Sequence, residues 1–148
     1  MGAIAIGIAG AIIVSPLLIP LVIVGGALVP AYNLELAGGR FHSDVWFALA
    51  WGGFPAFTGF FAQSLEITAA GVLVAAGCCM LSAAQRRLST PVRELRRNTA
   101  SVTGVQTLTD GSTRELTKAR LVEPLDGALS TLWIAIALVA VGVLAVKL

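Results

Sequence analysis

Hydrophobic residues occupy this chain in three long blocks. The first, from Met1 to Tyr32, contains no charged side chain. The second runs from Val45 to Ala84 and is broken by the polar cluster Gln63-Ser64-Leu65-Glu66, and the third covers Ala128 to Val146. A run of about 18 or more apolar residues has the length of a membrane-spanning helix, because the hydrocarbon core of a bilayer is roughly 30 Å thick. The pattern therefore predicts an all-α membrane protein.

The first block is longer than one crossing needs. As a single helix it would measure about 48 Å at 1.5 Å per residue. Pro16 and Pro20 lie near its middle, and each proline removes a main-chain donor and disfavours helix at the residue before it. Two alternatives stay open: one kinked span over residues 2–32, or a helical hairpin that turns at residues 15–16.

The other two blocks give three more spans, predicted at residues 45–62, 67–84 and 128–146. The whole chain, 1–148, is then one transmembrane domain, a bundle of four to five helices. Gly52, Gly53 and Pro55 lie in the first of these three spans. Small residues let membrane helices approach closely, and we expect Pro55 to kink this helix.

Charged residues concentrate in the polar region 85–127, which holds eight of the ten basic residues. Arg40 lies in the shorter polar loop 33–44. Counting spans places both loops on one side of the membrane, and the positive-inside rule makes that side cytoplasmic. The sequence thus predicts a multi-pass integral membrane protein with both loops in the cytoplasm.

The polar region 85–127 contains its own local signals. Thr90-Pro91 is typical of a helix start, and the arginines that follow suit an amphipathic helix resting on anionic lipid headgroups. Residues 102–109 favour β-structure, and Asp110-Gly111 is a strong turn signal, so a small β-hairpin is expected there. Residues 112–121 could equally form a helix.

Composition agrees with a membrane protein and excludes some functions. Hydrophobic residues make up 57% of the chain and charged residues 12%, against roughly 25% charged residues in soluble domains. A net charge of +2 is too small to indicate a nucleic-acid partner. Cys78 and Cys79 are adjacent, which is the spacing of neither a zinc site nor a disulfide framework, so we interpret them as packing residues.

One segment resembles a known family. Tyr32 closes an apolar block, a polar loop with Arg40 follows, and the next helix contains Gly52, Gly53 and Pro55. This order resembles the central part of the UbiA family, over roughly residues 1–87 and loosely the last span. Members of that family are membrane prenyltransferases that join an isoprenoid diphosphate to an aromatic or other lipid-soluble acceptor. The resemblance implies that Tyr32 and Arg40 face a cytoplasmic active-site cavity.

The family's two acidic, magnesium-binding motifs are missing. The first would precede Met1. The second would fall near the end of the span 67–84, where Arg86 and Arg87 stand instead. Arginines can hold a phosphate directly but cannot assemble a magnesium site. The resemblance therefore implies the C-terminal part of a diverged relative, with no catalytic or metal-binding residues of its own. Mg²⁺ is expected only if a missing acidic half is supplied.

The candidate substrate-binding residues each have a simpler interpretation. Tyr32 could be a membrane-interface anchor, and Arg86 and Arg87 could be topology determinants. His42 and Asp44 could form a proton-transfer pair, but Ser43-Asp44 also has the pattern of a helix N-cap, which we favour. The candidates are Tyr32, Arg40, His42, Asp44, Arg86 and Arg87.

Three functions fit these observations. The chain could be a UbiA-like fragment or half-molecule that binds an isoprenoid diphosphate or a quinone-like lipid, with prenyl transfer only when another chain supplies the acidic half. It could be a small non-catalytic accessory subunit of a larger membrane complex. It could also be a transporter-like or lipid-binding protein without catalysis. The expected partners are membrane lipids and a partner chain or second copy.

Overall fold

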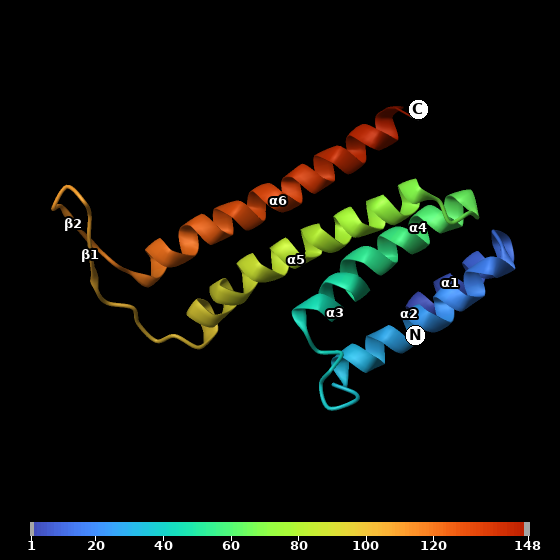
Figure 1. Cartoon of the computed structure of the whole chain (residues 1–148), viewed down its shortest axis with the longest axis horizontal. Helices are drawn as coiled ribbons and strands as arrows, with labels where there is room; N and C mark the ends of the chain where they lie inside the picture. The colour runs from blue at the N-terminus through green and yellow to red at the C-terminus, as the bar shows by residue number, and fades with distance from the viewer. Residues whose placement is uncertain (1, 147–148) are drawn as a thin grey trace. The chain divides into compact units, whose positions relative to one another are not determined.

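A computed structural model describes residues 2–146 of the chain. They fall into two compact units, which divide between Ala84 and Gln85. Four helices are long and apolar enough to cross a membrane, and they cover Pro16–Asn33, Asp44–Ser64, Ala69–Arg97 and Lys118–Gly142. The predicted helical class, with four apolar helices of spanning length, is confirmed at this level (Figure 1).

The first unit begins with a helical hairpin. Helix α1 (Gly2–Ile13) ends before Ser15, whose backbone is extended and whose hydroxyl accepts a hydrogen bond from the Leu17 amide at 3.2 Å. A short 3-10 turn at Pro16–Leu18 leads into α2 (Ile19–Asn33). The structure thus has the hairpin, not the single kinked helix. Pro16 explains the turn, because it disfavours helical geometry at Ser15.

The next rod consists of α3 (Asp44–Ala48), a π-helical turn at Leu49–Gly53 and α4 (Phe54–Ser64). In the π turn, the Phe54 amide bonds to the carbonyl of Leu49, five residues earlier. Pro55 has no amide hydrogen, so the regular helical pattern cannot continue through it. The irregularity expected at Pro55 is therefore a widened turn on its N-terminal side, a feature frequent at functional sites.

Close contacts at glycines join the helices of the first unit. A Cβ built on Gly52 would lie 2.6 Å from the carbonyl oxygen of Cys78, which belongs to α5 (Ala69–Arg97). A Cβ on Gly71 would lie 2.7 Å from the Phe60 ring, and one on Gly7 would lie 2.9 Å from Val22. At Gly52 the close neighbour is main chain and leaves no room for a Cβ, whereas at Gly71 and Gly7 a neighbouring side chain would have to shift; such close approaches are expected for membrane-type helix packing.

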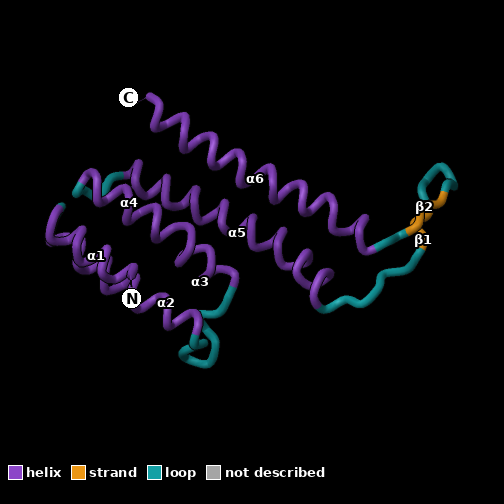
Figure 2. The backbone as a smooth tube through the Cα atoms, turned by 180° about the vertical axis from the view of Figure 1, so that it is seen from behind, coloured by secondary structure: helices purple, strands orange, loops and turns teal. Residues whose placement is uncertain are grey.

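The second unit comprises the C-terminal part of α5, a β-hairpin and α6 (Lys118–Val146). Strands β1 (Val105–Thr107) and β2 (Thr113–Glu115) pair antiparallel, with Gln106 opposite Arg114. Gly111 adopts a φ of 81°, a conformation that glycine takes without strain. The predicted hairpin is confirmed, and Figure 2 shows it in the connection between α5 and α6.

Two predictions for the region 85–127 were wrong. No new helix begins at Thr90-Pro91, because α5 runs through Pro91 to Arg97. Pro91 removes only one main-chain donor, and the Thr90 hydroxyl donates to the Arg86 carbonyl at 2.9 Å, so this turn of helix keeps hydrogen bonds. The alternative of a helix over residues 112–121 is also wrong at its start, where β2 lies, and helix begins only at Lys118.

Candidate functional site

The candidate site of the first unit forms where α2 ends. Tyr32 lies in the last turn of α2 and is only 8% exposed, one of the few large side chains buried in the structure. Its main-chain carbonyl accepts a hydrogen bond from the Glu35 amide at 3.4 Å, which begins the unwinding of the helix. Tyr32 is thus held firmly at the boundary between an apolar helix and a polar loop.

The polar loop that follows α2 has an unusual backbone. Glu35 and Ala37 adopt φ values of 50° and 57°, and Gly38 and Gly39 have φ values of 69° and 80°. Left-handed geometry costs a residue with a Cβ roughly 1–2 kcal/mol. Strain of this kind gathers at ligand-binding and active sites, where the surrounding structure maintains it.

The loop folds back on the end of α2, so that His42 contacts Tyr32. The two rings stack with their centroids 4.6 Å apart and their planes 30° from parallel. The imidazole Nδ1 lies 3.2 Å from the Tyr32 carbonyl oxygen. A carbonyl only accepts, so we assign the hydrogen to Nδ1, which leaves Nε2 for a second partner. Because His42 is exposed, this second nitrogen belongs to a solvent-accessible ring.

Two aromatic residues of the next rod complete the surroundings of Tyr32. Trp51 meets the tyrosine ring edge-on, with centroids 6.1 Å apart and an interplanar angle of 86°. Phe47 lies at the same centroid distance with the planes tilted by 55°. Edge-to-face contacts of this kind contribute about 0.5–1.5 kcal/mol beyond their buried area. The result is a compact aromatic cluster of Tyr32, His42, Phe47 and Trp51.

Ser43 and Asp44 form the start of α3. The Ser43 hydroxyl accepts a hydrogen bond from the Trp46 amide at 3.3 Å, and Asp44 lies in the first turn, where a carboxylate is favoured by the helix dipole. The capping interpretation favoured from the sequence therefore describes Ser43 correctly. His42 lies with its Nδ1 3.2 Å from the Tyr32 carbonyl oxygen, and the proton-transfer pair of His42 with Asp44 stays a prediction.

The six sequence-predicted residues fall into two groups. Tyr32 and His42 meet directly, and exposed Arg40 and Asp44 lie in the same short segment. Arg86 and Arg87 belong to the second unit, on α5. There the Arg86 carbonyl accepts from the hydroxyls of Ser89 and Thr90. The site that the structure builds is thus the aromatic cluster with its loop.

Sequence reasoning did not assign Phe47 and Trp51 to Tyr32. Their spacing of four residues, which places them on one helix face, was the available signal. The strained conformations of Glu35 and Ala37 had no signal, because neither residue type favours positive φ.

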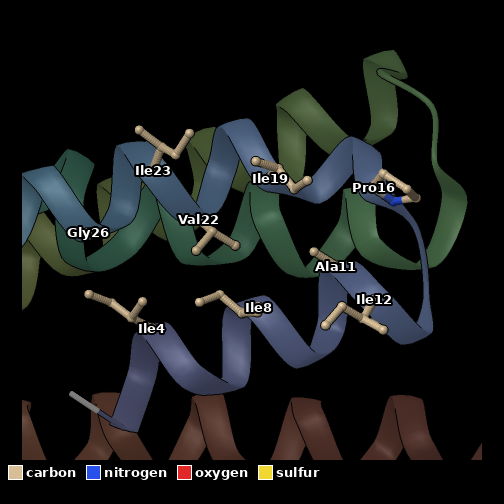
Figure 3. Close-up of a pocket in the computed structure, with 9 residues that line it drawn as sticks. All are labelled: Ile4, Ile8, Ala11, Ile12, Pro16, Ile19, Val22, Ile23 and Gly26. Atoms are coloured by element: carbon tan, nitrogen blue, oxygen red, sulfur yellow. The ribbon is translucent and has the colours of Figure 1, made fainter.

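A large cavity in the first unit is purely apolar. It has a volume of about 560 Å³ and lies between α1 and α2 (Figure 3). Its walls include Ile4 and Ile8 from α1 and Ile19 and Val22 from α2. Such walls offer no hydrogen bond, so the cavity suits hydrocarbon and supplies no chemistry.

Metal-ligand chemistry has no ready site in the part of the chain that the structure describes. Among residues 2–146, no three His, Cys, Asp or Glu side chains gather as a group that could hold a metal ion. Comparisons of the chain with models of protein families, with curated proteins and with solved structures gave no match.

Proposed function

We propose that this chain is a multi-pass integral membrane protein that binds the head of an isoprenoid lipid beside Tyr32 and His42. The membrane assignment is supported by large aliphatic side chains that are exposed on the helix surfaces, where contact with water would be unfavourable. Ile6, Ile13 and Leu138 are 75%, 81% and 66% exposed, and they belong to a long series of exposed aliphatic residues on the apolar helices. Soluble proteins rarely expose such continuous apolar surface, whereas a bilayer covers it.

The orientation follows from the basic residues. Two spans separate the loop 34–43 from the region after Ala84, so both lie on one side if α4 and α5 each cross once. Nine of the ten basic residues belong to that side. The positive-inside rule then places the aromatic cluster at the cytoplasmic surface.

The single observation that carries the ligand assignment is the stacked Tyr32–His42 pair in its strained loop. The exposed His42 ring, which lies against the buried Tyr32 ring at the end of an apolar helix, offers an aromatic surface to the polar end of a lipid, with hydrocarbon available to its tail. The exposed Arg40 in the same loop supplies a guanidinium, which suits a diphosphate. An isoprenoid diphosphate or a quinone-like lipid combines these features, in accordance with the resemblance to the UbiA family.

In this proposal the chain binds the isoprenoid lipid but does not catalyse prenyl transfer by itself. Prenyl transfer in the UbiA family needs carboxylates that hold Mg²⁺ against the leaving diphosphate. Residues 2–146 offer no such cluster. Activity would therefore require an acidic half on another chain or segment.

The binding test uses the full chain in detergent with two probes, farnesyl diphosphate and ubiquinone-2. We expect His42→Ala to weaken binding of at least one probe by about tenfold, which corresponds to about 1.4 kcal/mol. The matched control is Phe41→Ala, since Phe41 lies in the same loop but its ring contacts Trp46 instead, with centroids 4.9 Å apart and planes tilted by 56°. Affinities of both probes that stay within twofold of wild type in His42→Ala would reject the site.

A second substitution tests the arginines of α5. If Arg86 and Arg87 also contact the phosphate, replacing both with Gln should weaken farnesyl diphosphate and leave ubiquinone-2 unchanged, because only the first probe carries charge. Equal binding of farnesyl diphosphate by wild type and variant would remove these two residues from the site.

The accessory-subunit alternative is favoured by a different observation. Within the described residues, no atom outside the helix's own neighbourhood lies within 4 Å of a Cβ built on Gly10, Gly59 or Gly77. Open glycine positions on apolar helices are where further helices pack in membranes. A monodisperse monomer in mild detergent, with no change on Gly77→Leu, would count against this alternative.

A further inference from the structure

The C-terminal end of α5 extends beyond a bilayer core. The helix runs unbroken for 29 residues (Figure 1), which is about 43 Å at 1.5 Å per residue. The hydrocarbon layer measures roughly 30 Å, and about 40–45 Å with headgroups included. Counted from Ala69 at the opposite edge, Arg93 lies about 36 Å along the helix axis. In the membrane placement proposed above, this length is sufficient for the end of α5 to reach the headgroup layer.

Two arginines of this segment are not neutralised by an ion pair. Arg96 forms a salt bridge with Asp126 of α6. In the described part of the chain, no such carboxylate partner accompanies Arg93 or Arg97. These two side chains are spaced four residues apart, so they project from the same face of the helix.

A hollow of about 410 Å³ lies between these side chains, lined by Thr90, Arg93, Glu94, Arg97 and Asn98. Thr90 uses its own hydrogen to bond the Arg86 carbonyl, and its oxygen lies 3.5 Å from Nη2 of Arg93. The residues of the lining thus include two arginines and one asparagine, whose guanidinium and amide groups can donate hydrogen bonds. Guanidinium forks match the geometry of phosphate oxygens and bind them bidentately.

Glu94 makes the hollow unsuitable for a bare anion alone. Its carboxylate leaves the lining with a formal charge of only +1, from two arginines and one glutamate. A ligand that carries an ammonium close to its phosphate would satisfy both signs. Phosphoethanolamine headgroups have this arrangement.

We propose that Arg93 and Arg97 bind the phosphate of a membrane phospholipid, with Glu94 accepting the ammonium of an ethanolamine headgroup. The position of Arg93 and Arg97 at the end of a helix of membrane-spanning length favours a lipid phosphate over a soluble one. The site rests on the membrane placement proposed above, but it is independent of the Tyr32–His42 cluster.

The test reconstitutes the full chain in phosphatidylcholine nanodiscs doped with either phosphatidylethanolamine or phosphatidylglycerol. Retained lipid is counted by native mass spectrometry after release. We expect Arg93→Gln/Arg97→Gln to lower retention of phosphatidylethanolamine by about tenfold. The matched control is Arg114→Gln/Arg120→Gln, which removes the same charge from β2 and α6, outside the hollow. An equal loss of phosphatidylethanolamine retention in both double variants would overturn the site, because it would show that general charge attraction holds the lipid.

Further variants and probes test which group of the lipid headgroup is recognised and whether the bound ligand comes from the bilayer. Glu94→Gln should shift retention from phosphatidylethanolamine toward phosphatidylglycerol, and no shift would remove Glu94 from the site. Soluble glycerophosphoethanolamine should not displace the lipid, and displacement would overturn the assignment to a bilayer lipid. His42→Ala should leave retention unchanged, which distinguishes this site from the proposed isoprenoid site. A chain that stays monomeric in buffer without detergent would overturn both proposed sites, because both rest on the membrane placement.

Discussion

Individual glycines set the distance between the helices of the first unit. At Gly52 the nearest atoms are the Cys78 carbonyl oxygen and the Ser82 Cβ, both 2.6 Å from where a Cβ would lie. One of these is main-chain, so it cannot rotate away as a side chain does. Gly59 lies further along the same run of helix, in α4, and open space surrounds the point where its Cβ would lie. The two glycines have the same chemistry and opposite environments.

We therefore predict that Gly52→Ala destabilises the protein by about 1–3 kcal/mol, because overpacking forces the backbone apart. Thermal unfolding in detergent measures the effect, with Gly59→Ala as the control. The alanine at position 59 should leave Tm unchanged or raise it slightly, since alanine favours helix over glycine. Equal Tm values for the two variants would show that α5 does not approach Gly52 in the protein.

At the same scale, the candidate site shows which residues a sequence can identify. Tyr32 and His42 stood out by their chemistry and by their place beside apolar blocks. Their stacking could not be foreseen, because it depends on Glu35 and Ala37 taking left-handed conformations that their residue types disfavour. Only the packed loop supplies the free energy that maintains those conformations.

Among the elements, the β-hairpin followed its local signal and α5 did not. Asp110-Gly111 is a turn whose chemistry acts over a few residues, so sequence was sufficient to place it. Thr90-Pro91 is ambiguous, because proline occurs both in the first turn of a helix and inside one. The outcome depended on whether α5 was already helical before Pro91, which is a property of the long helix.

The hairpin turn also gives a pH prediction. The Ser112 hydroxyl donates to Oδ1 of Asp110 at 2.7 Å and the Ser112 amide at 2.9 Å, and these bonds lower the pKa of Asp110. A lowered pKa in the folded state stabilises the turn above the ordinary aspartate pKa, and this stabilisation is lost as the pH falls through the folded value. Ser112→Ala should raise the pKa of Asp110 toward its ordinary value.

An NMR titration of the Asp110 carboxyl measures this change. Ser101→Ala, an exposed serine outside the hairpin, serves as the control and should leave the titration unaltered. An Asp110 pKa that is the same in Ser112→Ala and in wild type would contradict the hydroxyl's role.

For the whole molecule, the governing property is the order of apolar helices and basic segments. The proposed orientation places Gln106 of the hairpin in the cytoplasm and Glu66, in the turn before α5, on the opposite side. Both side chains are exposed in the structure.

We predict that, with Cys78 and Cys79 replaced by alanine, Glu66→Cys reacts with a membrane-impermeant maleimide on intact cells. Gln106→Cys should react only after permeabilisation, because the bilayer separates it from the reagent. Labelling of Gln106→Cys from outside would reverse the orientation, and labelling of neither in intact cells would remove Glu66 from the outer surface.

The sequence by itself determined the three apolar helices that follow residue 44 and the positions of the turns at residues 63–66 and 110–111, and it left open whether the first block turns at residues 15–16. These follow from the hydrophobicity and turn chemistry of short segments, which do not depend on distant residues. Tertiary structure decided that His42 stacks on Tyr32, that Gly52 touches α5, and that α5 continues past Pro91 to Arg97. Each of these outcomes depends on the path of the backbone between residues, and hydrophobic patterns do not specify that path.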